Sequence, residues 1–134
     1  MADIKGFIKK YDGKTLSDWG SVVSPEFKSF QTCFINAVKK IAASIGGEVV
    51  RASKGHYDVC GFIKKDDKYV YFDYSNGCGY GGRTHVILTK NNHYSQPLLI
   101  RRARHDKDWT GLTNHFCAFE NMETYVKQLF VEFI

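Results

Sequence analysis

Apolar positions follow a helical spacing in the segment that begins near Ser24. Every third or fourth residue there is apolar, which places one set of side chains on one side of a helix: Phe27, Phe30, Phe34, Ala37, Val38, Ile41 and Ile45. Ser24 is a favourable N-cap, and Pro25 suits the first helical position. The glycine pair at positions 46 and 47 ends the pattern. The sequence therefore predicts an amphipathic helix over about residues 25–45.

A second helical pattern occupies the last part of the chain. Its apolar residues repeat at the same spacing: Met122, Tyr125, Val126, Leu129, Phe130 and Phe133. Asn121, directly before them, is a plausible N-cap. We predict a second amphipathic helix from there to Ile134.

Between these helical segments the chain shows the two-residue alternation of β-strands. Residues 56–63 alternate, and one face of this strand is formed by Tyr57, Val59, Gly61 and Ile63. Residues 69–74 are rich in aromatic side chains, and the polar run 64–68 before them predicts a hairpin turn. The remaining features are strands at 48–53, 84–90 and 98–104, a glycine-rich loop at 76–82 and a turn at Asn91 and Asn92.

Short links between successive strands favour an antiparallel meander over a parallel sheet. We expect one α+β domain over residues 1–134, in which an about five-stranded antiparallel sheet carries an N-terminal and a C-terminal amphipathic helix packed on one face. The other face would be solvated or would bind a partner. Residues 1–20 have no clear pattern: residues 6–14 suit a short strand with a turn or an N-terminal arm, which Trp19 would dock on the core.

Charge and aromatic content narrow the class of protein. The 134 residues include 10 Phe, 8 Tyr and 2 Trp, enough large rings to fill a core and to leave some for a partner. The formal net charge is +5, and it is spread along the chain apart from one dense run near Arg101. A spread charge of this kind is more typical of a solvated surface than of a nucleic-acid footprint.

The cysteines bear on compartment and on cofactor. They are Cys33, Cys60, Cys78 and Cys117. The first residues contain no apolar segment typical of a secretion signal, and no stretch approaches the ~20 apolar residues that span a bilayer. We therefore expect a cytoplasmic protein without membrane contact, whose thiols are reduced.

Zinc is the cofactor that these residues suit best. His115 and Cys117 would share one face of a strand, Cys60 lies on another strand, and Cys78 lies in the glycine-rich loop. One hypothesis is that these four residues form a tetrahedral zinc site. The sequence has neither a Cys-x-x-Cys nor a His-Glu-x-x-His motif, so the alternative is that the cysteines are small core residues.

No recognised catalytic motif is present, and we do not expect an enzyme. A thiol nucleophile needs a base within hydrogen-bond reach. Cys117 and His115 would be two residues apart on a strand, which is about 6–7 Å and too far for a direct bond, and Cys60 and His56, four residues apart, would be farther still. The base would have to come from another strand, as His85 would for Cys60.

A basic and aromatic run is the densest surface signal. Its charged and aromatic residues are Arg101, Arg102, Arg104, Lys107 and Trp109. This combination suits phosphate groups or an acidic protein surface, and Tyr80 in the glycine-rich loop is a further candidate contact. Because consecutive arginines point to both faces of a strand, that strand is an edge or has an exposed end. On the alternative interpretation, an edge strand carries these charges to prevent aggregation.

Residues 99–104 (LIRRAR) and 107–114 (KDWTGLTN) resemble a segment of small uncharacterised proteins of phages and other bacterial mobile elements. Accessory proteins of such elements are often anti-defence factors, including anti-CRISPR inhibitors, that act by occupying a surface. The resemblance implies a non-enzymatic protein in the host-cell cytoplasm that inhibits a CRISPR-Cas-like nucleoprotein by binding to it. A nucleic-acid-binding module that uses the basic-aromatic run is one alternative, and a small zinc-binding or thiol-dependent protein is another.

Overall fold

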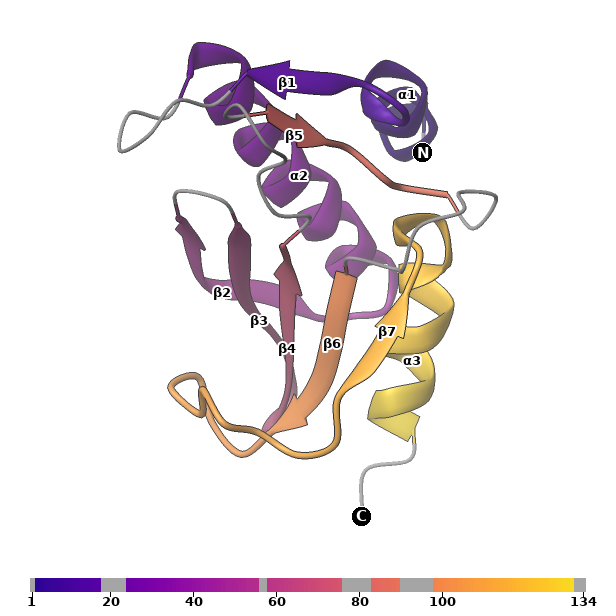
Figure 1. Cartoon of the computed structure of the whole chain (residues 1–134). Helices are drawn as coiled ribbons and strands as arrows, with labels where there is room; N and C mark the ends of the chain where they lie inside the picture. Colours follow the sequence, from indigo (N-terminus) through magenta and orange to yellow (C-terminus); the bar gives the residue numbers. More distant parts are fainter. Residues whose placement is uncertain (1, 18–23, 56–57, 76–82, 90–97, 132–134) are drawn as a thin grey trace.

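The computed structural model describes residues 2–17, 24–55, 58–75, 83–89 and 98–131 (Figure 1). Within them the chain begins with helix α1, strand β1 and helix α2: Ala2–Tyr11, Thr15–Ser17 and Pro25–Ser44. Strands β2 to β7 follow: Glu48–Lys54, Val59–Lys65, Lys68–Tyr74, Arg83–His85, Leu98–Ala103 and His115–Cys117. A 3-10 turn at Phe119–Asn121 leads into helix α3, Met122–Val131.

The main sheet is antiparallel and has the strand order β2-β3-β4-β6-β7. α2 and α3 cover one face, where their apolar sides share a core with strand residues such as Val59, Ile63 and Phe72. This confirms the expected α+β fold with helices on a five-stranded antiparallel sheet. β2 forms one edge and contains a bulge, at which Arg51 adopts a left-handed φ of 52°.

α2 forms where its pattern predicts it. The Ser24 hydroxyl accepts a hydrogen bond from the Phe27 backbone N–H at 3.1 Å, which is the expected N-cap. The side of α2 that faces the sheet buries three phenylalanines, Phe27, Phe30 and Phe34. None of the helices in the described parts of the chain combines the length and apolar character needed to cross a bilayer.

The first segment of the chain is a helix, not the short strand or arm that the sequence suggested. In α1, Ile4, Phe7, Ile8 and Tyr11 follow a helical spacing, and they pack toward the core. The Phe7 ring lies 5.8 Å from the Phe30 ring and 5.1 Å from the Phe119 ring. Four apolar positions in one short segment, interrupted by lysines and a glycine, carried too little periodicity to reveal the helix. Trp19 lies outside the described residues.

The predicted strand at 84–90 is also wrong. Only Arg83–His85 form a strand, and it pairs with β1 in a separate two-stranded sheet. Val86, Ile87 and Leu88 are buried, but side chains satisfy part of their backbone: the Tyr74 hydroxyl accepts from Ile87 N–H at 2.8 Å and donates to its carbonyl at 3.1 Å. Residues 86–88 are apolar because they are buried, although they do not pair with a strand, and this is why their sequence resembles that of a strand. The fifth strand of the main sheet is β7, so β6 pairs with β4 and β7.

Candidate functional site

The face of the main sheet opposite α2 and α3, here called the open face, is built from rows of paired residues. One row crosses the sheet through Phe62, Tyr71 and Arg101. The next row consists of Cys60, Asp73, Leu99 and Phe116. Directly paired residues point to the same side of a sheet, so these side chains meet there. Phe62, Tyr71 and Ala103 form the buried centre of a small second core on this face.

The connection between β6 and β7, residues 104–114, is held in shape by Asp108. The carboxylate of Asp108 is buried and accepts hydrogen bonds from the backbone N–H groups of Arg104 at 2.8 Å and Gly111 at 2.9 Å. It also accepts from the Thr110 hydroxyl and forms an ion pair with Arg104 at 3.0 Å. The hydrogen bond from the Arg104 backbone, followed by that from Gly111, holds the pKa of Asp108 well below its usual value.

This loop places Trp109 over the open face. The Trp109 ring lies 5.2 Å from the Phe62 ring and 6.1 Å from the Tyr71 ring, almost perpendicular to the latter. Arg101 joins the group because its guanidinium lies 4.4 Å from the centre of the Tyr71 ring. Arg101 also donates to the Trp109 carbonyl and to Asn114 Oδ1. Trp109 nevertheless keeps 50% of its surface exposed.

The other residues predicted for a contact face are distributed differently. Lys107 is exposed on the loop, and Arg104 is paired with Asp108. Arg102 is paired with Val70, which belongs to the helix-side core, so Arg102 points away from the open face. Tyr80 lies outside the described residues. The structure therefore brings together Arg101 and Trp109 of the predicted set.

The position of β6 in the sheet tests the two interpretations of its arginines. β6 is not an edge strand, because it lies between β4 and β7. β7 pairs only with Leu98, Leu99 and Ile100, so among the strands of the described residues none pairs with the Arg101–Ala103 end of β6 on that side. The edge-strand interpretation is therefore wrong, and the end of β6 is not open either: Arg101 and Arg102 are half-buried, and the Leu112 backbone N–H donates to the Arg102 carbonyl at 3.0 Å.

Sequence reasoning missed the apolar part of this surface. Phe116 is 57% exposed beside Leu99, and Leu112 in the loop is 43% exposed. The alternation in residues 56–63 did contain a signal, since Phe62 falls on the face opposite Val59 and Ile63. Two apolar faces on one strand indicate that the second face is also covered or bound.

A polar cluster lies next to the aromatic residues. The Tyr71 hydroxyl donates to Asp73 Oδ2 at 3.0 Å, whereas Asp73 Oδ1 is buried without a partner among the described residues. Burial is the main cause that raises the pKa of Asp73, and the nearby Asp58 carboxylate adds to it. Burial likewise raises the pKa of the Cys60 thiol. Cys60 therefore stays protonated at neutral pH, which makes it a weak nucleophile.

The proposed zinc ligands divide between the two faces of the sheet. His115 and Cys117 do share a face, as predicted, but they are paired with Ile100 and Leu98 of the helix-side core. Cys60 lies on the open face, and Cys78 lies outside the described residues. Within the described ranges, no group of three or more His, Cys, Asp or Glu side chains is arranged to hold a metal ion.

Of the two histidines considered as bases for the Cys60 thiol, His85 lies in the small β1–β5 sheet. His85 Nδ1 lies 3.4 Å from the Thr15 hydroxyl in the small sheet, and His56 lies outside the described residues. Burial raises the pKa of the Cys117 thiol to about 12, so this thiol also stays protonated.

What the described geometry offers is a preorganised surface: an aromatic group with a stacked arginine, fixed by a rigid loop and bordered by exposed apolar side chains. No protein family, curated protein or solved structure was found to match this chain.

Proposed function

We propose that this protein is a non-enzymatic binding protein of a phage or mobile element, which inhibits a CRISPR-Cas-like nucleoprotein by occupying part of its surface. The observation that carries the proposal is the grouping of exposed apolar side chains. Trp109, Leu112 and Phe116 are all exposed, and all belong to the β6–β7 loop or to β7. Exposed apolar groups gathered in one region are typical of a protein-binding surface.

The construction of the surface supports binding. Large aromatic side chains and arginine contribute most of the binding energy at protein interfaces. Trp109 is held by Phe62, Tyr71 and the Asp108-bonded loop before any partner arrives. Little side-chain entropy is then lost on binding, which increases affinity.

The charges near Trp109 favour an acidic partner. Arg101 and Lys107 lie next to it, whereas Arg104 is paired with the buried Asp108 at 3.0 Å and Asp106 is paired with Arg51 at 3.2 Å. The remaining potential is positive, and it would steer the protein toward acidic surface. A carboxylate-rich protein lobe of an effector complex has this chemistry.

Direct binding and inhibition test the proposal together. Purified protein would be titrated against a panel of CRISPR effector ribonucleoproteins by biolayer interferometry, and target cleavage would be followed with the same samples. We expect binding and inhibition with at least one effector, and a loss of roughly 30-fold or more in affinity for Trp109→Ala.

The control is Val131→Ala, which shortens an exposed apolar side chain on α3. Its affinity should equal that of the unmodified protein. Equal losses for both variants, or binding to none of the effectors, would count against the proposal.

A nucleic-acid-binding role is the second candidate, because Arg101 stacked on Tyr71 beside an exposed tryptophan resembles a platform for unpaired bases. Trp109 would then be quenched by a single-stranded oligonucleotide, and affinity would fall about tenfold or more between ~50 and ~200 mM salt. Quenching that is absent, or that does not depend on salt, excludes this role.

A further inference from the structure

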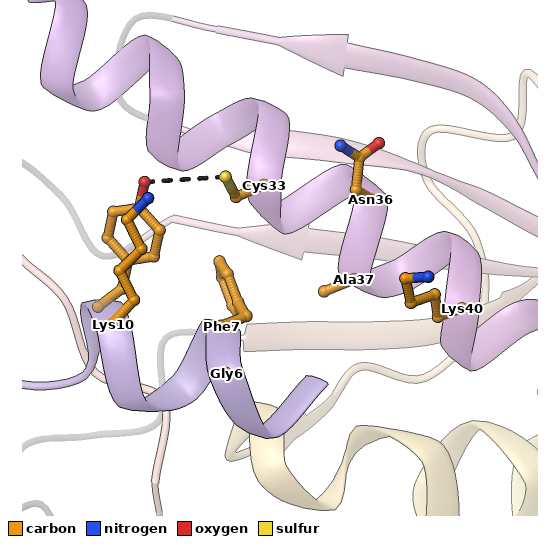
Figure 2. Close-up of a pocket in the computed structure, with 8 residues that line it drawn as sticks. Gly6, Phe7, Lys10, Cys33, Asn36, Ala37 and Lys40 are labelled. Carbon is orange, nitrogen blue, oxygen red and sulfur yellow. Dashed lines mark hydrogen bonds between the residues drawn. The ribbon is translucent and has the colours of Figure 1, made fainter. Parts of the chain in front are cut away.

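α1 and α2 leave a groove between them on the helical side of the molecule (Figure 2). It has a volume of about 390 Å³, and its floor includes Phe7 and Ala37. Figure 2 shows these two residues between Lys10 at one end and Lys40 at the other. A second hollow of about 690 Å³ shares Lys40 with the first and continues along α2 to Ser44.

The groove combines an apolar floor with a basic rim. Lys10 and Lys40 line the groove and Lys39 lines the hollow that continues it, and the described lining residues of both include no carboxylate. The nearby Asp12 is directed elsewhere, since it accepts hydrogen bonds from the Leu88 backbone N–H at 2.7 Å and from the Thr89 hydroxyl. This lining is complementary to a ligand that carries both negative charge and an apolar group.

Gly6 at the wall of the groove is an independent observation. It lies inside α1, where glycine is less favourable than alanine by about 1 kcal/mol. The chain itself gives no reason for a glycine, because a Cβ at this position would meet nothing within 4 Å and the φ angle is not left-handed. Gly6 instead leaves space at the wall of the groove, which allows another backbone to approach closely.

We propose that the groove binds an acidic segment of a partner protein, with an apolar side chain against Phe7 and Ala37, its backbone passing Gly6, and its carboxylates at Lys10 and Lys39. The site is separate from the open face, which lies on the other side of the sheet. One molecule thus has two contact regions, and both can be occupied at once.

The dimensions favour a peptide over a compact ligand. From Cys33 to Ser44 the helix rises about 16 Å, the length of about five extended residues. Tyr11, which lies between Lys10 and Cys33, adds no charge at neutral pH, because its hydroxyl donates to Cys33 Sγ at 3.8 Å and burial raises the pKa of Tyr11 to about 12. Positive charge is therefore confined to the lysines, where carboxylates spaced along a peptide would reach it.

Chemical-shift mapping with isotope-labelled full-length protein tests the site. The probe is a pool of synthetic octapeptides composed of Asp, Glu, Leu and Phe, compared with a pool composed of Lys, Arg, Leu and Phe and with a single-stranded oligonucleotide. We expect only the acidic pool to shift amides of α1 and α2, including that of Gly6.

Two variant pairs connect these shifts to the groove. Gly6→Leu fills the wall and should abolish binding, whereas Gly6→Ala adds only one methyl group at the wall, so it should weaken binding to a smaller extent and melt at a higher temperature. Lys39→Glu should weaken binding about fivefold, and Lys127→Glu on α3 should not change it.

The result that overturns the proposal is equally defined. No shifts with the acidic pool, shifts outside α1 and α2, or equal shifts with the basic pool would each do so. Shifts with the oligonucleotide alone would assign the groove to nucleic acid instead. None of these outcomes depends on the open face, so Trp109→Ala should leave the peptide affinity unchanged.

Discussion

Single buried carboxylates decide much of the local structure, and Asp108 and Asp73 do so in opposite ways. Asp108 is fully satisfied by backbone donors and by Arg104. Asp73 is half-satisfied, because Tyr71 donates to one oxygen while the other is buried without a partner among the described residues. Ionised Asp108 should therefore stabilise the fold, whereas ionised Asp73 should destabilise it.

Asp108→Asn should lower the free energy of unfolding by about 2–3 kcal/mol, because a buried charged acceptor is replaced by a neutral amide. The pKa of Asp108 is lower in the folded protein than in the unfolded chain, so its contribution is present above about pH 4 and is lost as pH falls toward the folded value. Urea unfolding at pH 7 and pH 3 measures both effects. The control is Asp106→Asn, which breaks only a surface pair with Arg51 and should cost less than about 1 kcal/mol.

Asp73→Asn should raise the melting temperature at pH 7. The folded pKa of Asp73 is raised, so its contribution to stability is greatest below about pH 4 and is lost as pH rises through the folded pKa. Asparagine does not ionise, so the variant does not lose stability as pH rises, and its amide oxygen can still accept a hydrogen bond from the Tyr71 hydroxyl. Thermal melts from pH 4 to pH 8 should show the gap between the two proteins widening with pH. A variant that melts lower than the unmodified protein at every pH would contradict this account.

At the scale of elements, prediction succeeded where the local pattern was long and capped, and it failed where the pattern was short, as in α1, or where backbone bonds came from distant residues. α2 was predictable because its cap, proline and apolar stripe all lie within one segment. β5 and the segment after it were not, because Ile87 takes its backbone bonds from a tyrosine 13 positions away. The candidate site divided in the same way: Arg101 and Trp109 were visible as a run, but their meeting with Phe62 and Tyr71 depends on strand register.

Two glycines in different elements give a matched test. Gly61 in β3 is enclosed, since a Cβ there would lie 2.9 Å from Phe72 Cζ and 3.1 Å from Ala52 Cα. Gly61→Ala should therefore destabilise the protein by about 1–3 kcal/mol through overpacking. Gly6→Ala in α1 meets open space and should stabilise it by up to about 1 kcal/mol. Chemical denaturation of both variants measures the difference, and equal signs would refute the packing described for Gly61.

At the scale of the whole molecule, two polar side chains, those of Tyr74 and Asp12, join the small β1–β5 sheet and α1 to the rest of the fold. Tyr74 reaches from β4 to Ile87, and Asp12 reaches from the end of α1 to Leu88. Figure 1 shows α1 and the small sheet at one end of the molecule, beyond the main strands. These contacts let a segment without a strand ladder remain buried.

Tyr74→Phe should lower the free energy of unfolding by about 1–3 kcal/mol, because it leaves the N–H and the carbonyl of Ile87 buried without this partner. Hydrogen exchange should accelerate at residues 86–88 more than in β3 or β4. Tyr125→Phe on α3 is the control, since that side chain is exposed. A uniform acceleration across the main sheet would show that Tyr74 acts only through global stability.

The bulge at Arg51 bears on how copies of this protein meet one another. Sheets lengthen by adding a strand to a straight, unpaired edge. The edge at β2 is bent by an exposed arginine in a left-handed conformation, and the edge at β7 is three residues long. Both features disfavour the addition of a further strand, so we expect neither edge of the main sheet to serve as a template for polymerisation.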